Sequence, residues 1–534
     1  MAAHAGTMFL FAAAFVLIIV PAAGLIRHLR ALPRPQSAVE RVDPFREWIG
    51  VVALGQMVLW CVLVGVLAAG LALVWAWWMR GLPRRARPWA MGVGLSPLLL
   101  PSYLAYAGWN LLRAPGTWLG DALAVAPVSI AANAWRAFAL VGLTLWVWPL
   151  ALLVLAPAAA RLPRSVLEAM GADGAPPRVV LLHVVRMLWR DIARAAVLCA
   201  LVMAGSAIPL HVAQVYTYSI WLWSEMNRVP DLRGVWLASW PLLAVAVAGA
   251  VFVLRLVPGA SRDDGGADEL ADGVAEVETR GQVQRGVWVV LTACAAALWA
   301  CSVLVPLLLF VLSVREVSAF AEFWRQSGAA VWHSAHAAAW TGGVGALVLL
   351  AAWVSVSGVR SAEGRRSVSQ VVLLLTVVGL VPGVLVGSAY ALAAPASGLP
   401  LVVLTHLARF AFVGAIIGWW LGASEPADLR DARELDGGAT FRGWLLACVR
   451  PRWAAVLGAA VAMAMLSLHE IESTVQVLPP GLDNLAQFLL DQLHYLRQDQ
   501  LAAAGASMAA AGLLGAVAGG VLLAKARTGE SERS

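Results

Sequence analysis

Ionisable side chains are rare in the apolar stretches of this chain, and the few present there are the first candidates for chemistry. Arg409 lies inside an apolar run, and His406 precedes it by about one helical turn. Glu470, Glu472 and Thr474 follow the next apolar run, and we expect the two carboxylates at its outer end. A charge inside a bilayer costs about 2.5–3.5 kcal/mol on insertion scales, so Arg409 should face a partner or water. We expect Arg409 to be a structural anchor, with substrate binding as the alternative.

The sequence lacks the motifs of the common enzyme classes. A phosphate-binding GxxxxGK[ST] loop would need a lysine before Ser or Thr, whereas the only lysine, Lys525, precedes Ala526. HExxH, CxxC and GxSxG signatures do not occur. The cysteines show no pairing pattern and mostly lie in apolar runs, so we interpret them as small apolar residues: Cys61, Cys199, Cys294, Cys301 and Cys448. The prediction is a non-enzyme with no cofactor and no resident metal.

Apolar runs of membrane-spanning length recur along the chain. Hydrophobic residues make up 61% of the 534 residues and charged residues 13%, which reverses the balance of a soluble domain. A helix crosses a bilayer with about 20 apolar residues. Such runs predict spans near 8–26, 50–78, 89–112, 137–159, 192–212 and 234–257, and then near 287–313, 336–358, 370–393, 399–421, 453–470 and 500–523. We therefore expect an all-α polytopic membrane protein of about twelve helices, arranged as two repeated six-helix halves.

The segment 261–285 separates these halves. It is acidic, Gly-rich and poor in large apolar residues, so it cannot form a core and is predicted to be a flexible cytoplasmic linker. The first half is then 1–260 and the second half is 286–534.

Basic residues predict the orientation of the spans. Several arginines follow the second and eighth spans, and Lys525 and Arg527 follow the twelfth. The positive-inside rule places these connectors, both termini and the linker in the cytoplasm. The first hairpin opposes this orientation, because its arginines fall outside: Arg27, Arg30, Arg34, Arg41 and Arg46. The net charge of +7 is scattered over connectors, which argues against nucleic-acid binding.

Two cytoplasmic loops, 161–188 and 424–451, repeat each other. Each follows the fourth span of its half, and the shared residues are always 263 positions apart. The pairs are Pro163 with Pro426, Glu168 with Asp431, Ala169 with Ala432, Asp173 with Asp436, and Gly174 with Gly437. Such a repeat argues against two unrelated connectors. Proline before a short helix and glycine at its end predict a capped helix that reverses in a left-handed residue.

These loops resemble the EAA loops of the permease subunits of binding-protein-dependent ABC importers. Glu168-Ala169-Met170 with Gly174 fits the family pattern EAAxxxG, and Asp431-Ala432-Arg433 with Gly437 fits a weaker form. Neither loop keeps the LP pair that closes the pattern. The resemblance implies that both loops dock on ATPase subunits and couple nucleotide-driven closure to the pore. Arg433 must find an acidic partner or tilt its helix away, so we expect Glu168 to matter more than Asp431 for docking.

Further residues are candidates for the pathway or gate. Gly94-Leu95-Ser96-Pro97 and Gly379-Leu380-Val381-Pro382 put a proline in corresponding spans, where it would kink a moving pore wall. The stretch from Glu470 through Thr474 to Ala486 resembles the ExxxT and PPGxxTLA pattern of ferric-iron-type permeases, with Asn484 where the family usually has Thr. The other interpretation is a rigid external turn before an interfacial helix, 484–495. In the first half, Ser206, Ile208 and Pro209 occupy the equivalent region.

The sequence thus favours a fused importer permease in the lipid bilayer, with two cytoplasmic ATPase subunits and an extracytoplasmic substrate-binding protein as partners. Ferric iron is the favoured solute, while thiamine, polyamine, phosphonate and inorganic anions stay open. The alternative is an ion-coupled secondary transporter of twelve helices, which would need carboxylates at mid-membrane depth.

Overall fold

Helices are the only regular elements in the described part of the chain. The computed structural model describes residues 2–31, 44–83, 85–113, 116–228, 232–256, 282–359, 361–393, 398–438, 440–494 and 499–510. Within these ranges no strand occurs. The predicted all-α fold class is therefore confirmed. Residues 261–281 of the predicted linker and residues 511–534 lie outside the described residues. Residues 282–285 are helical and begin α14 (Gln282–Trp299), so the linker was predicted too long at its second end.

Eight described helices are long and apolar enough to cross a bilayer: Ala3–Ala31, Trp48–Arg80, Val128–Ala160, Arg233–Leu256, Gly286–Ser313, Ser318–Gly358, Leu399–Ala423 and Phe441–Leu468. Two further pairs qualify only as bent elements. Arg87–Leu99 and Ser102–Arg113 meet at 77°, and Glu363–Leu380 and Gly383–Ala393 meet at 103°. The fold is that of a polytopic membrane protein with eight candidate spans, or ten if each bent pair is one span.

Ten of the twelve predicted spans coincide with these elements. The predicted span 192–212 covers the end of α9 (Pro177–Ala204), a break at Gly205 and the short helix α10 (Ile208–Val212). Residues 499–510 of the predicted span 500–523 are helical, and the rest lie outside the described residues. The count of twelve stays a prediction.

Each half has a core of three long helices that pack side by side. In the first half these are α3 (Pro44–Arg80), α7 (Val128–Ala160) and α9, and in the second half α16 (Ser318–Gly358), α19 (Leu399–Ala423) and α22 (Trp453–Leu468). Small residues let the helix backbones approach closely, as is typical of membrane bundles. A Cβ atom at Gly418 of α19, for example, would overlap the Leu349 carbonyl of α16.

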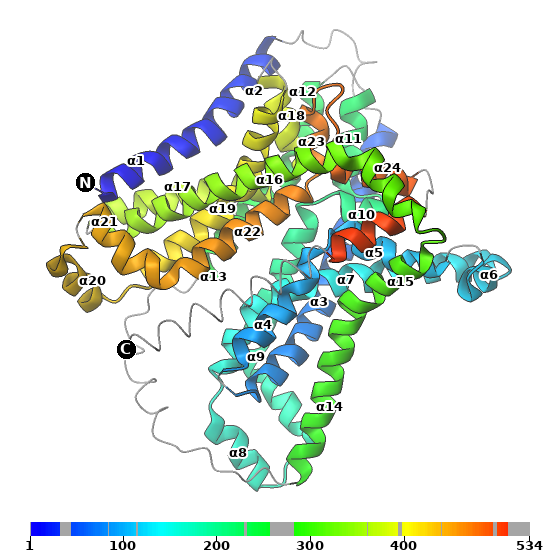
Figure 1. Ribbon diagram of the computed structural model, residues 1–534, viewed down its shortest axis with the longest axis horizontal. Helices are drawn as coiled ribbons and strands as arrows, with labels where there is room; N and C mark the ends of the chain where they lie inside the picture. Colours follow the sequence, from blue (N-terminus) through cyan, green and yellow to red (C-terminus); the bar gives the residue numbers. More distant parts are fainter. Residues whose placement is uncertain are drawn as a thin grey trace.

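The first span of each half packs on the other half (Figure 1). α1 (Ala2–Ala14) lies along α16, and α2 (Val20–Ala31), which continues it through the π-helical turn Phe15–Ile19, contacts α18 (Gly383–Ala393). Correspondingly, α14 (Gln282–Trp299) contacts α3, and α15 (Val305–Ser313) contacts α5 (Ser102–Asn110). The same pairings in both halves support the internal repeat that the loop spacing predicts.

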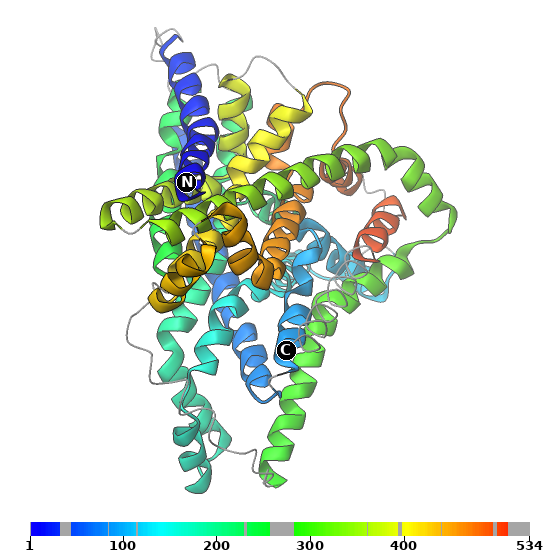
Figure 2. The same ribbon diagram turned by 60° about the vertical axis from the view of Figure 1, so that its left-hand side comes forward.

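The other elements complete the two halves and their connections (Figures 1 and 2). In the first half they are α4 (Arg87–Leu95), η3 (Ser96–Leu99), η4 (Leu111–Arg113), α6 (Trp118–Ala124), α8 (Arg164–Ala172), α11 (Tyr218–Arg228), α12 (Leu232–Ala238) and α13 (Trp240–Leu256). In the second half they are η5 (Ala300–Leu304), α17 (Ala362–Leu380), α20 (Ala427–Arg433), η6 (Glu434–Gly438), α21 (Phe441–Trp444), η7 (Leu445–Val449), η8 (Arg450–Arg452), α23 (Glu472–Val477) and α24 (Leu485–His494).

Candidate functional site

Both repeated loops contain the predicted short helix. Pro163 directly precedes α8, and Pro426 is the residue before α20. Both helices present exposed residues, which are Ala169 and Asp173 in the first loop and Asp431 and Ala432 in the second. Glu168 lies in α8, and Asp436 lies in η6, but their side chains are outside the described part. The backbone and the exposure of these loops suit a docking surface.

The two loops end differently. Gly174 has a φ of +67°, which confirms the predicted left-handed reversal after α8. At Gly437 the structure differs from the prediction, because α20 continues into the π-helical turn η6, which includes Gly437. Arg433 explains the extra turn: its Nη1 donates to the Gly438 carbonyl at 3.3 Å and holds the turn against the end of α20.

A buried carboxylate holds the second loop. Glu425 accepts hydrogen bonds from Arg433 Nε at 3.0 Å and from Arg433 Nη2 at 3.3 Å. Arg430 Nε lies 3.5 Å from the same carboxylate, and all three side chains are at most 14% exposed. Arg433 thus has the acidic partner that the sequence required, and α20 does not tilt away for lack of one. Leu162 stands 263 positions before Glu425, so the first loop has no equivalent carboxylate.

Both loops lie at corresponding ends of their halves. Arg80, at the end of α3, donates from Nη2 to the Leu162 carbonyl of the first loop at 2.8 Å. At the end of α16, Trp353 lies 5.4 Å from Trp444, which follows the second loop helix. α14 begins beside the end of α3, where Trp78 Nε1 donates to Thr292 Oγ1 at 3.2 Å. The two loops and the start of the second half therefore lie at equivalent ends of the spans.

A buried polar network surrounds Arg409 of α19. The Arg409 side chain is 6% exposed, and its Nη2 lies 3.6 Å from Glu470 Oε2. The guanidinium also donates to the carbonyls of Gly205, Gly379 and Val381. Arg409 is therefore paired and anchors several backbone segments, as expected. Glu470 lies two residues after the end of α22, at the end of the predicted span, and its side chain is buried.

Glu472 is also buried, with 2% of its surface exposed. Its Oε1 accepts from Ser206 Oγ at 2.7 Å, from Ile208 N at 3.0 Å and from Ala207 N. Its Oε2 accepts from Gly383 N at 3.2 Å. Ser206, Ala207 and Ile208 belong to the first half and Gly383 to the second. One carboxylate therefore joins the two halves.

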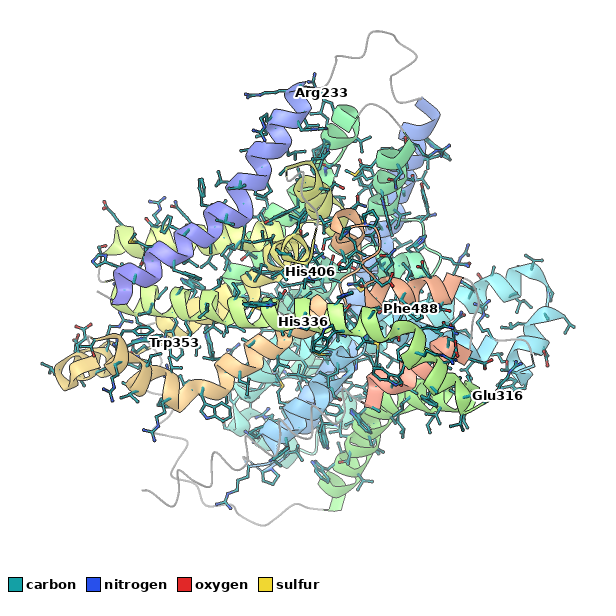
Figure 3. The ribbon with its side chains drawn as sticks, turned by 45° about the horizontal axis from the view of Figure 1, so that its top comes forward. Arg233, Glu316, His336, Trp353, His406 and Phe488 are labelled. Atoms are coloured by element: carbon teal, nitrogen blue, oxygen red, sulfur yellow. The ribbon has the colours of Figure 1, made fainter. Side chains whose placement is uncertain are left out.

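His406 contacts two hydroxyl groups of this network and lies near the centre of the molecule in Figure 3. It is fully buried, with its ring nitrogens 2.7 Å from Ser467 Oγ and 2.7 Å from Thr474 Oγ1. Ser467 donates onward to Thr341 at 3.2 Å, and Thr474 donates to the Glu470 carbonyl at 2.9 Å. The predicted pathway residues Glu470 and Thr474 are thus brought together with Arg409 and His406.

Of the two predicted prolines, Pro382 lies at the break of its bent pair, whereas Pro97 lies before the first break, which is at Leu100 and Pro101. Pro382 precedes α18, where Arg409 contacts the Val381 carbonyl, and Pro97 lies in η3. In the first half, Trp146 stands 263 positions before Arg409, and its Nε1 donates to the Leu100 carbonyl at 2.8 Å. A bend frees carbonyls that lipid cannot satisfy. Corresponding side chains of the two halves therefore supply donors at the two bends.

The stretch after α23 forms an exposed turn and a capped helix. Asn484 Oδ1 accepts from Ala486 N at 2.8 Å and from Gln487 N at 3.2 Å, which caps α24. The turn lines a cavity of about 350 Å³ together with Asp483 and Phe488. This geometry supports the interpretation as a rigid turn before a short helix.

Sequence reasoning missed the roles of Glu425 and Glu472. Glu425 had a signal, because it precedes the loop helix by few residues and Arg433 needed a partner. The sequence signal for Glu472 was weaker: it is a second carboxylate, two residues after Glu470, in a strongly apolar region. Its donors around Ser206 are far away in the sequence and could not be paired with it.

Comparisons of the chain with protein-family models, with curated proteins and with solved structures gave no match. Among the described residues, no group of three or more His, Cys, Asp or Glu side chains is arranged to hold a metal ion. The candidate function therefore rests on the residues and on their geometry.

Proposed function

We propose that this chain is the membrane-spanning permease of an ATP-driven importer, in which two fused halves form one passage at their interface. The observation that carries the proposal is the pair of short exposed helices α8 and α20. They follow corresponding spans, share residues 263 positions apart and lie at corresponding ends of their halves. Each would dock on one cytoplasmic ATPase subunit.

The exchanged first spans support this proposal. Because α1 and α2 pack on the second half while α14 and α15 pack on the first, motion of one half is passed directly to helices of the other. The bends at Pro101 and Pro382 supply the points at which the wall of the passage can change shape. The arginines near α8 and α20 agree with a cytoplasmic position of this end, in a bacterial inner membrane.

An extracytoplasmic binding protein would deliver the solute, and ferric iron remains the favoured solute from the resemblance of the Glu470–Ala486 stretch. Iron would then be the cargo of the passage.

Purification of the full chain from its native membranes in mild detergent tests the ATPase partnership. We expect ATP hydrolysis to co-purify with the chain and to fall several-fold in a Glu168→Ala variant. Glu363→Ala, at an exposed position in the first turn of α17, is the matched control and should keep the activity. Absence of ATP hydrolysis from the purified wild-type complex would count against the proposal.

One observation favours the second candidate, an ion-coupled secondary transporter. Glu470 and Glu472 are buried beside Arg409 and His406, and buried carboxylates are what such carriers use. Membrane vesicles separate the two mechanisms: uptake that survives a protonophore but needs internal ATP supports the importer, and uptake that collapses with the ion gradient supports the carrier.

A further inference from the structure

The contact of Glu472 with the first half is a built site for a carboxylate. Three donors come from consecutive residues of the first half, which are the Ser206 hydroxyl and the N–H groups of Ala207 and Ile208. A fourth, Gly383 N, lies at the bend between α17 and α18. A carboxylate this deeply buried is stable only when donors replace its water, and Glu472 finds them on both sides of the interface.

Only the second half supplies a carboxylate to this contact, although the fold is repeated. Pro209 stands 263 positions before Glu472, so the first half has no carboxylate to offer in return. Arg409 adds a second link at the same place, because its Nη2 donates to the Gly205 carbonyl of the first half at 3.3 Å. Apart from the bond that Gly383 donates, these bonds run between the second half and residues 205–208, at the break between α9 and α10.

We propose that Glu472 is a latch that closes the passage between the two halves, held shut by its hydrogen bonds to Ser206, Ala207 and Ile208. The inference rests on the proposed function, in that it takes the interface of the halves to be the passage. Separating the halves at this point must break these bonds. Gly383 lies where α18 meets the bend, so rotation of α18 about the bend would withdraw the donor on the second half at the same time.

A leak assay tests the latch on the full chain reconstituted alone in liposomes, without ATP or partners. We expect the wild type to be tight and Glu472→Ala to raise the passive chloride leak about tenfold, as loss of one or two net buried hydrogen bonds would allow. Glu316→Ala, at an exposed position between α15 and α16 (labelled in Figure 3), should leave the leak unchanged.

Formate gives the test its specificity, because it is a carboxylate small enough for the space that Glu472→Ala leaves. We expect added formate to lower the chloride leak of this variant toward the wild-type level. Added chloride at the same ionic strength should leave the leak high. A leak that formate does not change would overturn the proposal, as would a Glu472→Ala chain as tight as the wild type.

If Glu472→Ala does not fold, the leak of Glu472→Asp tests the latch instead. It keeps the charge but is one methylene shorter, so a raised leak supports the latch and a wild-type leak contradicts it. The leak assay and the co-purification of ATP hydrolysis from native membranes have independent outcomes. If Glu472→Ala leaks but no ATP hydrolysis co-purifies with the wild-type chain, the importer is contradicted and the latch stands. If ATP hydrolysis co-purifies but the variant is tight, the latch is contradicted and the importer stands.

Discussion

Trp146 and Arg409 occupy corresponding positions of the repeat, and both donate hydrogen bonds to backbone carbonyls at a bend. Trp146 donates to the Leu100 carbonyl beside one bend, and Arg409 donates to carbonyls around the other. Tryptophan supplies one neutral donor, whereas the guanidinium supplies several and brings a charge that Glu470 must balance. The second bend is therefore tied to an ion pair and the first is not.

Replacing Trp146 by Phe should destabilise the chain by about 1 kcal/mol, because the Leu100 carbonyl loses its donor and the ring remains. Thermal unfolding in detergent measures the change. Trp118→Phe is the control, since Trp118 is 79% exposed and its truncation should leave the transition in place. Equal shifts in both variants would show that the Trp146 hydrogen bond contributes nothing.

Glu425→Gln should loosen the second loop strongly. It removes the charge that faces Arg430 and Arg433, and breaking a buried ion pair from one side typically costs about 3–5 kcal/mol. We expect a lower unfolding temperature and faster tryptic cleavage within 424–451. Glu363→Gln removes an exposed carboxylate and should change neither quantity. Unaltered cleavage of the Glu425→Gln chain would mean that the η6 turn stands without this carboxylate.

At the scale of elements, the two loop helices share a beginning and differ in their ends. The sequence predicted both helices from their prolines and their spacing, and both exist. It could not predict that α20 continues into η6, since that depends on where the Arg433 side chain goes. Gly437 matches Gly174 as a residue type, but a glycine permits a left-handed conformation without requiring it.

Substitutions at Gly174 should distinguish the cost of its left-handed backbone conformation from the cost of adding a side chain at this position. A Cβ atom there would meet no atom within 4 Å, so Gly174→Ala costs only the left-handed conformation, about 1–2 kcal/mol. Asn adopts that conformation more readily, so Gly174→Asn should retain more ATPase co-purification than Gly174→Ala. Gly437→Ala, inside a helical turn, should have the smaller effect of the two alanine changes. If Asn and Ala behave alike at Gly174, its φ is not what the first loop needs.

At the scale of the whole molecule, the halves are held together by exchanged helices as well as by the Glu472 contact. α1 packs on α16 so closely that a Cβ atom at Gly6 would overlap Val354. On the other side, Trp148 Nε1 donates to Ser302 Oγ at 2.9 Å across the interface. These contacts join described residues of the two halves, so we expect the halves to stay together without the linker 261–285.

Cutting the chain within 261–285 should leave both halves together. A protease site inserted there, cleaved after reconstitution, should give two fragments that co-purify in mild detergent, because the exchanged spans continue to bury the same surfaces. The uncleaved chain carrying the same site is the control. Fragments that separate would show that the linker carries part of the association.

Ten of the twelve span positions could be predicted because each reflects a local property, a run of apolar residues of sufficient length. The bend at Pro382 followed from residue type as well, whereas the other bend lies at Pro101 and not at the predicted Pro97. Their angles of 103° and 77° could not be predicted. Exchange of the first spans and the approach of Glu472 to Ser206 could not be predicted. Both depend on which helix faces pack against each other, and the apolar faces of the different spans are too similar in composition to predict this from sequence.

The exchanged first spans also set an order of events during synthesis. α1 leaves the ribosome long before α16, its main packing partner, has been translated. At roughly 5–20 residues per second, this delay is on the order of tens of seconds. Throughout it, α1 must wait in lipid or beside the insertion machinery, with Gly6 and the face around it still uncovered. A substitution at Gly6 that spares the finished fold could therefore still lower the yield of inserted protein, by giving α1 another partner before α16 arrives.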